Sequence, residues 1–420
     1  MNQKIFGILI IIILISGCIT QQSNKKRSFL EAKEKLSQVE VAIWYQKLVD
    51  GMQIETGRDV ERVIEILKET KTDLIFRAWW RWSPCPENCE QVPESLKEKC
   101  KNNGYTYSHL GDAISKIKAK LPEIIIIGAV PAQKIDRRLW DPITGERIDY
   151  PKTWDIALDP SKWGVTKISK IELQCGAAEM LGYMGDNTNC DTYDPEKATG
   201  YVPDITNPKY QELLKAFIAK QIEEGCDGIW IDGLWWNVQI MYYITEDENH
   251  PAVKQTLNAS RSIIDWFHKK YPNKVIGTWS APRMPFVSAS LDFASLPSFA
   301  QQEILDLKIN ESLWDEKIQD ARSKFGNIPL ITFIDTGWGK SPMYYFSQNL
   351  SPEQQDEFLR VADEFFTKKN VIFAYPVHGG FMGKDATTLA YDKCLFYDSL
   401  APEFGTYETI KELAQKKKGE

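Results

Sequence analysis

The stretch Glu224-Gly-Cys-Asp-Gly-Ile-Trp-Ile-Asp-Gly-Leu-Trp-Trp236 decides the fold of this chain. A helical pattern over 207–223 leads into it, and its apolar run, 228–231, ends on Asp232 before a glycine that opens a turn. Because side chains alternate along a strand, Trp230 and Asp232 share one face. The pattern predicts a buried parallel strand with a carboxylate at its C-terminal tip, where catalytic groups lie in a (β/α)8 barrel. The alternative is that Asp232 only caps the following turn.

Other apolar runs of strand length alternate with helical patterns along the chain. Together they give expected strands at 39–45, 73–79, 123–130, 227–232, 274–279, 291–295, 328–335 and 371–377. The helical spacing of apolar residues predicts helices at 58–71, 109–121, 207–223, 252–271, 301–308, 313–325, 352–369 and 406–417. This alternation predicts an α/β fold, a single (β/α)8 TIM barrel, over residues 37–417. Long loop insertions follow strands 2 and 3, the second of them covering 131–205.

The composition is that of an ordinary globular protein, with a formal net charge of −7 over 420 residues. This balance offers no overall basic footprint, so no nucleic-acid partner is expected. The chain also contains 14 tryptophans. Flat apolar rings that carry an N–H group pack well against sugars, which favours a carbohydrate partner. Burial of tryptophan in the core of a large barrel is the alternative.

The first 18 residues have the pattern of a signal peptide, with one positive charge, an almost wholly apolar run at 5–15 and small residues before Cys18. The apolar run is shorter than a membrane-spanning helix needs. Ile15-Ser-Gly-Cys18 resembles a lipoprotein lipobox, which implies lipid attachment at Cys18. Residues 19–36 then form a polar tether. We therefore expect a lipid-anchored protein on the extracytoplasmic side of the cell membrane; without cleavage, the segment would be a weak anchor.

Five of the seven remaining cysteines lie in the two insertions, which suits disulfides in an oxidising compartment. We expect one bridge between Cys175 and Cys190, and a second between two of Cys85, Cys89 and Cys100. A zinc site on those last three cysteines would lack a fourth ligand unless His109 supplied it. No cofactor is expected, with a calcium ion in the Asp-rich loop 186–194 as the alternative left open.

In a barrel, the residues that end the strands meet at one rim, and here they combine carboxylates, aromatic rings, arginines and one histidine. Such a set, without a cluster of metal ligands, suits a polyhydroxylated substrate. Arg77 interrupts a strand and needs a carboxylate partner, either Asp232 or a helix-borne glutamate if it points outward. The expected substrate-binding residues are Tyr45, Arg77, Trp79, Arg81, Trp235, Trp236, Trp279, Arg283 and His378. Trp80 and Gln133 reach the same rim, and a purely structural His378 is the alternative to a sugar-binding one.

Glycoside hydrolysis needs two carboxyl groups across the scissile bond, one as the acid for the leaving oxygen and one as a nucleophile or base. We expect Asp232 to be the nucleophile or base, and Asp335, which ends another apolar strand, to be the acid. Glu303, which follows the sixth strand, is the rival acid. The alternative roles are a turn residue for Asp335 and a solvated residue in the first turn of a helix for Glu303.

Two motifs around the helix at 207–223 resemble those of glycoside-hydrolase-type TIM barrels. In Tyr201-Val-Pro-Asp-Ile-Thr-Asn-Pro-Lys-Tyr210, Asn-Pro-x-Tyr opens the helix before the fourth strand. In Gly225-Cys-Asp-Gly-Ile-Trp-Ile-Asp232, the last residue has the place of an active-site aspartate. The resemblance is sharp over 201–236 and architectural elsewhere. It implies a nucleophile-like Asp232, and it supplies no motif for the acid.

The function that this resemblance implies is a cell-surface glycosidase acting on a polysaccharide or glycoconjugate. The alternative is a non-catalytic carbohydrate-binding lipoprotein that keeps the barrel. The second carboxylate separates the two, because without one near Asp232 only binding remains. A metal-dependent barrel hydrolase is disfavoured because histidines are scarce at the strand ends.

Overall fold

A computed structural model describes residues 34–48, 56–80, 86–104, 106–337, 339–392 and 394–419. The expectations for the signal peptide, the lipid site Cys18, most of the tether, Arg81 and Cys85 lie outside these residues. Residues 34–37 already form a helical turn, and Leu36 is buried in the core. The folded body therefore includes the last residues that the sequence assigns to the tether.

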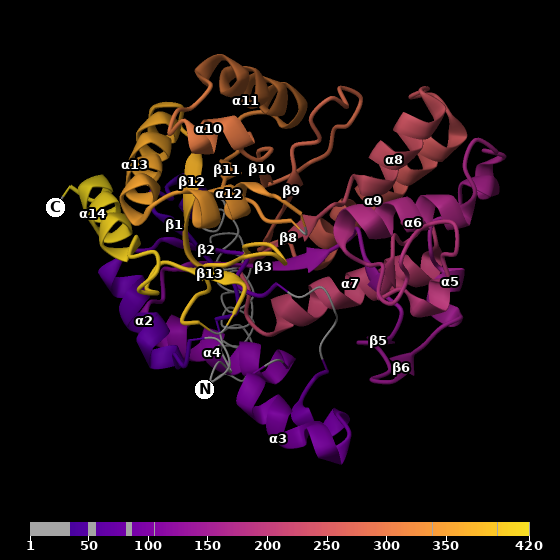
Figure 1. Cartoon of the computed structure of the whole chain (residues 1–420), viewed down its shortest axis with the longest axis horizontal. Helices are drawn as coiled ribbons and strands as arrows, with labels where there is room; N and C mark the ends of the chain where they lie inside the picture. Colours follow the sequence, from indigo (N-terminus) through magenta and orange to yellow (C-terminus); the bar gives the residue numbers. More distant parts are fainter. Residues whose placement is uncertain are drawn as a thin grey trace, which may run out of the picture.

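Eight parallel strands form a closed barrel at the centre of the molecule (Figure 1). In order around the barrel they are β1 (Ala42–Tyr45), β2 (Leu74–Phe76), β3 (Ile125–Pro131), β8 (Gly228–Asp232), β9 (Val275–Trp279), β10 (Phe293–Ser295), β11 (Leu330–Thr332) and β12 (Ile372–Phe381). Pairing of β1 with β12 closes the ring, and β13 (Phe396–Asp398) adds an antiparallel strand to β12. The predicted (β/α)8 TIM barrel is confirmed, with each expected strand in its place.

Helices surround the barrel on its outside (Figure 1). Those that match expected helices are α2 (Val60–Glu69), α4 (Tyr107–Lys120), α7 (Pro208–Glu223), α9 (Pro251–Lys270), α10 (Gln301–Leu305), α11 (Glu311–Phe325), α13 (Pro352–Lys368) and α14 (Tyr407–Lys417). Most begin at a side-chain cap; Asp59, for example, accepts from the backbone N–H of Arg62. β9 and β10 are the exception to the alternation, because residues 280–292 join them without a helix.

Aromatic side chains fill the barrel interior. Trp230 packs edge-on against Phe76 and Phe333, with ring centroids 5.3 and 5.9 Å apart, and its indole N–H donates to Ser295 Oγ at 2.9 Å. Gly277 leaves room for the ring of Phe293, which a Cβ at that position would meet at 2.3 Å. This packed interior fixes the strand ends, and with them the rim.

The insertion after β2 contains η1 (Cys89–Gln91) and α3 (Glu94–Asn103), joined by a Cys89–Cys100 disulfide. This bridge is one of the expected pairings, and it removes the thiolates that a zinc site would need. His109 Nδ1 lies instead 2.6 Å from Thr106 Oγ1. Among the described residues, the one group with metal-ligand geometry is Cys175, Glu179 and Cys190, and its two cysteines form a disulfide.

The insertion after β3 is more regular than its sequence indicates. It contains the two-stranded sheets β4 (Ile135–Asp136) with β7 (Gly200–Tyr201) and β5 (Leu139–Trp140) with β6 (Arg147–Ile148). Its helices are α5 (Lys152–Asp155), η2 (Pro160–Trp163), α6 (Lys170–Leu181) and η3 (Pro195–Lys197). The expected Cys175–Cys190 disulfide is confirmed and ties α6 to the loop that follows it. Two further helices lie outside the prediction, α8 (Trp236–Thr245) and α12 (Pro342–Asn349).

No helix among the described residues is long and apolar enough to cross a membrane.

Candidate active site

A cavity of about 320 Å³ opens at the C-terminal ends of the barrel strands. This is the face where (β/α)8 barrels carry their sites, and the volume falls in the range of small-ligand pockets. Residues that follow six different strands contribute to its wall, together with Leu181 at the end of α6. The lining side chains are Arg77, Trp80, Gln133, Leu181, Asp232, Trp235, Trp236, Gln239, Trp279, Ala281, Pro282, Met284, Pro297, Asp335 and Thr336.

Asp232 ends β8 at the cavity and is held by N–H donors on both carboxylate oxygens. Trp279 Nε1 donates to Oδ1 at 2.6 Å, and Gln133 Nε2 donates to Oδ2 at 2.8 Å. Burial raises the pKa of Asp232, whereas the Arg77 charge and these hydrogen bonds act to lower it. Gln133 and Trp279 both donate to the carboxylate, so the ionised form fits this environment.

Arg77 lines the cavity, and its side chain is only 3% exposed. Its guanidinium carbon lies 4.7 Å from the ring centroid of Trp44 and 4.3 Å from that of Trp80. The backbone adopts a left-handed conformation, φ 56°, which is costly for a residue with a Cβ and is a kind of strain found at functional sites. The contacts with Trp44 and Trp80 show that the Arg77 side chain points into the barrel, so the alternative that it points outward to a helix is wrong.

Asp335 follows β11 and faces the same guanidinium, with Arg77 Nη1 3.8 Å from Asp335 Oδ1. Burial raises the pKa of Asp335 to about 7; Arg77 opposes that rise, and the Asp232 carboxylate adds to it. Burial also lowers the pKa of Arg77, while the two carboxylates act to raise it. Two carboxyl groups thus share one cation, and Asp335 is the one suited to hold a proton near neutral pH.

Four tryptophans form much of the apolar wall. Trp235 donates its indole N–H to the backbone oxygen of Trp279 at 2.9 Å, which fixes two of these rings relative to each other. The indole nitrogen of Trp236 has no hydrogen-bond partner among the described residues. Gly233 has φ 67°, and a Cβ there would meet the side chain of Gln133 at 2.7 Å. The glycine after Asp232 therefore gives Gln133 room to reach the carboxylate.

The Asn-Pro-x-Tyr motif supports the same corner of the cavity. Asn207 caps α7 by accepting from the N–H groups of Lys209 and Tyr210 at 2.9 and 3.4 Å. Tyr210 then donates its hydroxyl to Ala132 O at 3.0 Å, and the N–H of Ala132 donates to the backbone oxygen of Asp232 at 2.7 Å. The motif thereby holds the segment that carries Gln133 against the end of β8.

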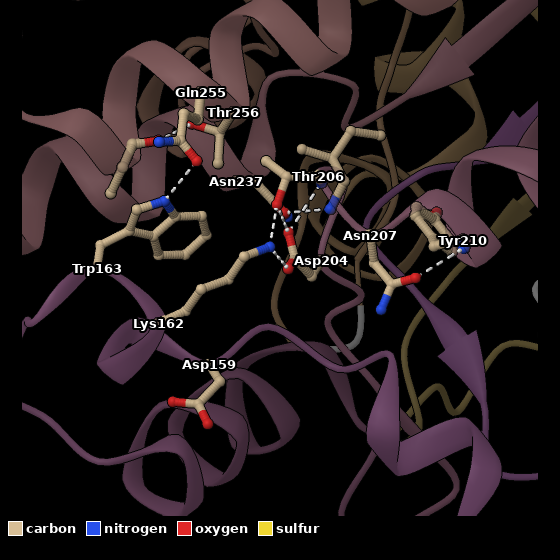
Figure 2. A network of polar contacts seen from close by, with 12 residues as sticks. Asp159, Lys162, Trp163, Asp204, Thr206, Asn207, Tyr210, Asn237, Gln255 and Thr256 are labelled. Carbon is tan, nitrogen blue, oxygen red and sulfur yellow. Dashed lines mark hydrogen bonds and ion pairs between the residues drawn. The ribbon is translucent and has the colours of Figure 1, made fainter.

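Polar contacts within the insertion after β3, and from it to α8 and α9, hold it in place (Figure 2). Lys162 Nζ lies 2.7 Å from Asp204 Oδ2, and Trp163 Nε1 donates to Gln255 Oε1 on α9 at 3.0 Å. Asn237 on α8 accepts from the N–H of Ile205 at 2.8 Å. Through these contacts the insertion forms a fixed wall that can carry Leu181 to the cavity.

Of the predicted site residues, Asp232, Asp335, Arg77, Trp235, Trp236 and Trp279 line this one cavity. Tyr45 and Trp79 are buried in the core, and Arg283 is exposed on the loop 280–292; none of the three is among the residues that line the cavity. Trp80, the next residue in the sequence, lines the cavity in place of the expected Trp79.

His378 belongs to a buried ionic cluster and is not among the lining residues. Its Nδ1 lies 2.7 Å from Asp398 Oδ2, and Asp398 also pairs with Arg58, whose Nη1 donates to Oδ1 at 3.0 Å. Burial acts to raise the pKa of Asp398, but the hydrogen bond from His378 and the charge of Arg58 hold it below its ordinary value. This arrangement corresponds to the structural alternative for His378.

Glu303 is not brought to the cavity. Its Oε2 accepts from the N–H of Ala300, and its Oε1 accepts from the N–H of Asn310 and from Trp314 Nε1, all at 2.8 Å. The residue is buried rather than solvated, and its carboxylate caps the start of α10 and joins it to α11. We therefore do not retain Glu303 as the rival acid.

Several lining residues escaped the sequence reasoning. Leu181 ends a helix within the region expected to be irregular, so nothing in the pattern places it at the rim. Gln239 lies one helical turn beyond Trp236, and this i, i+3 relation would have revealed it once α8 was recognised.

No protein-family model and no curated protein sequence matches this chain. The solved structure of CldA, a cyclomaltodextrin glucanotransferase, matches with a TM-score of 0.50 and 14% identity, over 90% of this chain and 80% of that one. The type III pullulan hydrolase from Thermococcus kodakarensis matches at 0.47 and 11%, over 92% and 70%. The debranching enzyme from Nostoc punctiforme matches at 0.47 and 10%, over 91% and 80%. At such identities, the likeness to CldA supports the barrel fold and nothing finer.

Proposed function

We propose that this protein is a glycoside hydrolase, with Asp232 as the nucleophile or base and Asp335 as the acid. The observation that carries the proposal is the pairing of two carboxyl groups around Arg77 in a tryptophan-lined cavity. Asp232 receives only N–H donors, which suits a carboxylate, while the pKa of Asp335 near 7 suits a proton donor. One acid and one base in the same cavity are what glycosidic cleavage requires.

The chain's own residues account for each step of this proposal. The tryptophan rings pack against the sugar and exclude water from it. Asp335 gives its proton to the leaving oxygen, and Asp232 attacks the anomeric carbon or activates a water molecule. Trp279 and Gln133 hold the Asp232 carboxylate during that step, and Arg77 balances the negative charge left when Asp335 loses its proton.

The test is the release of new reducing ends from a panel of polysaccharides by the protein and by Asp232→Asn and Asp335→Asn. We expect each variant to lose at least about 100-fold in turnover, the usual scale of an acid–base contribution. The matched control is Asp112→Asn, which changes an exposed aspartate on α4. If Asp232→Asn fails to fold, Asp232 has a structural role. Equal activity in all the variants would show that Asp232 and Asp335 do not take part in the reaction.

The structure gives a reason to prefer hydrolysis over binding alone, the other function that the sequence left open. Binding alone was the expectation if no second carboxylate approached Asp232. Asp335 lines the same cavity and interacts electrostatically with Asp232. If the protein binds polysaccharides of the panel but cleaves none of them, it is a carbohydrate-binding protein and not a hydrolase.

We further propose that the protein acts outside the cytoplasm, attached to the membrane through lipid on Cys18. Two disulfides, Cys89–Cys100 and Cys175–Cys190, support an oxidising compartment. Globomycin treatment of expressing cells would leave an unprocessed precursor if Cys18 is lipidated, and Cys18→Ser would give the same result. Normal processing under both conditions would argue against the anchor.

A further inference from the structure

We propose that an outer glycan-binding strip on α8 extends the cavity and accepts further units of an uncharged polysaccharide. The strip consists of Gln239 and Tyr243 on α8, supported by the rings of Tyr242 and, on the loop 280–292, of Phe286. This inference rests on the proposed function for the identity of its ligand, and it adds that the substrate is a chain longer than the cavity holds.

The strip continues the cavity wall along one face of a helix. Trp236 and Gln239 line the cavity from the first turn of α8. At 100° per residue, Tyr243 lies within about 20° of Trp236 around the helix axis and about 10 Å further along it. A chain that leaves the cavity over Trp236 and Gln239 therefore meets Tyr243 next.

Tyr243 has the exposure of a binding ring rather than of a packed one. It is 52% exposed, and among the described residues it is one of only five large apolar side chains with such exposure. Another of the five, Met180, is 56% exposed and directly precedes the cavity residue Leu181 on α6. α6 and α8 lie on the same side of the barrel (Figure 1), and Lys167, just before α6, donates to Ile244 O on α8 at 3.2 Å.

Neighbouring rings hold Tyr243 in place. Its ring centroid lies 6.0 Å from that of Tyr242, and Tyr242 packs edge-on against Phe286 at 5.2 Å. Phe286 is half-buried on the loop 280–292, which also gives Ala281, Pro282 and Met284 to the cavity wall. A ring supported on one side and open on the other can stack on a sugar with little loss of side-chain freedom.

The charges around the strip favour an uncharged glycan over other occupants. Three exposed carboxylates, Glu246, Asp247 and Glu248, follow α8 directly. The cations near the strip are Lys167, Arg283 and Arg261, whose guanidinium donates to the backbone oxygen of Phe286 at 3.5 Å. These charges balance, and the cavity sets two carboxyl groups against one guanidinium, so the region has no excess of positive charge. Acidic sugars and anionic lipid head groups are therefore disfavoured. Four side chains are also far fewer than the roughly 20 to 30 residues a side of a standard protein interface.

Affinity electrophoresis tests the strip without knowledge of the exact sugar. The gels contain amylose, dextran, pullulan, galactomannan or xylan as neutral probes, or polygalacturonate as the acidic one. The proteins are the full chain and its Asp232→Asn, Tyr243→Ala and Tyr243→Phe variants, with Leu96→Ala as a control that shortens an exposed apolar side chain on α3.

We expect at least one neutral polysaccharide to retard the protein, Asp232→Asn, Tyr243→Phe and Leu96→Ala alike. Tyr243→Ala should bind that polysaccharide roughly threefold to tenfold more weakly, the loss expected from one stacked ring. Three results would contradict the proposed strip. The protein could be retarded by polygalacturonate alone, or by no polysaccharide at all, or Tyr243→Ala could be retarded to the same degree as the parent.

Turnover separates this inference from the proposed function. If Tyr243-dependent retardation occurs but no reducing ends are released, the strip stands and the hydrolase assignment fails. If reducing ends are released and Tyr243→Ala keeps the KM of the parent on the same polysaccharide, the hydrolase assignment stands and the strip fails.

Discussion

At the residue scale, Asp232 and Asp335 share one cavity but differ in what surrounds them. Asp232 accepts hydrogen bonds from Trp279 and Gln133, whereas Asp335 has the Arg77 charge at 3.8 Å. The sequence was sufficient to place both carboxylates, because each directly follows an apolar strand. It could not reveal that Glu303 serves as a cap, because the N–H donors that occupy it come from segments whose packing no local pattern encodes.

The raised pKa of Asp335 has a consequence for stability. A carboxyl group whose folded pKa exceeds its unfolded value favours folding at low pH, and that contribution is lost as pH rises through the folded pKa, here about 7. We therefore expect Asp335→Asn to raise the melting temperature at pH 8 relative to the parent and to change it little at pH 4. Thermal unfolding of both proteins at the two pH values measures this, with Asp112→Asn as the control. A lower melting temperature for Asp335→Asn at pH 8 would contradict the assignment of a buried, costly carboxylate.

At the element scale, the strands and outer helices were predictable, and the helices above the rim were not. α6 buries mainly small residues such as Ala177 and Ala178, so it has no strong apolar stripe. Its signals were the capping box of Ser169 with Glu172 and the glycine at 182. α8 carries apolar residues on most of its faces, and this obscures the 3.6-residue period.

The disulfide on α6 should affect both stability and substrate binding. Cys175 and Cys190 close a 15-residue loop, and the double serine variant is expected to lose about 3 kcal/mol of stability. Because Leu181 ends the same helix and lines the cavity, KM should rise while kcat changes less. The control is the Cys89→Ser, Cys100→Ser variant, whose bridge lies in the other insertion. This control should lose stability without a change in KM. Equal KM values in the two variants would show that the disulfide on α6 does not affect substrate binding.

At the scale of the whole molecule, the barrel is closed by contacts between its two ends. β1 pairs with β12, and Arg58, just before α2, forms an ion pair with Asp398 at the end of β13. Alternating strand and helix patterns were enough to predict this closure. The ionic cluster was not predictable, because its members are separated by up to 340 positions and only the closed barrel brings them together.

Breaking that cluster should destabilise the entire fold. Asp398→Asn leaves the buried Arg58 guanidinium without its charge partner, and loss of one member of a buried pair typically costs about 3–5 kcal/mol. Chemical denaturation of the variant and of the parent measures the difference, and the transition should stay cooperative. A loss below about 1 kcal/mol, as for an exposed ion pair, would show that the cluster does not hold the barrel together.

The hydrogen bond from Trp279 to Asp232 also has an optical consequence. The emission of an indole depends on the charge beside its N–H, so protonation or occupation of the site changes the fluorescence of Trp279. Subtracting the spectrum of a Trp279→Phe variant isolates that signal from the other thirteen of the 14 tryptophans. The site thus contains its own reporter of binding, one that can be followed with a sugar that is never cleaved.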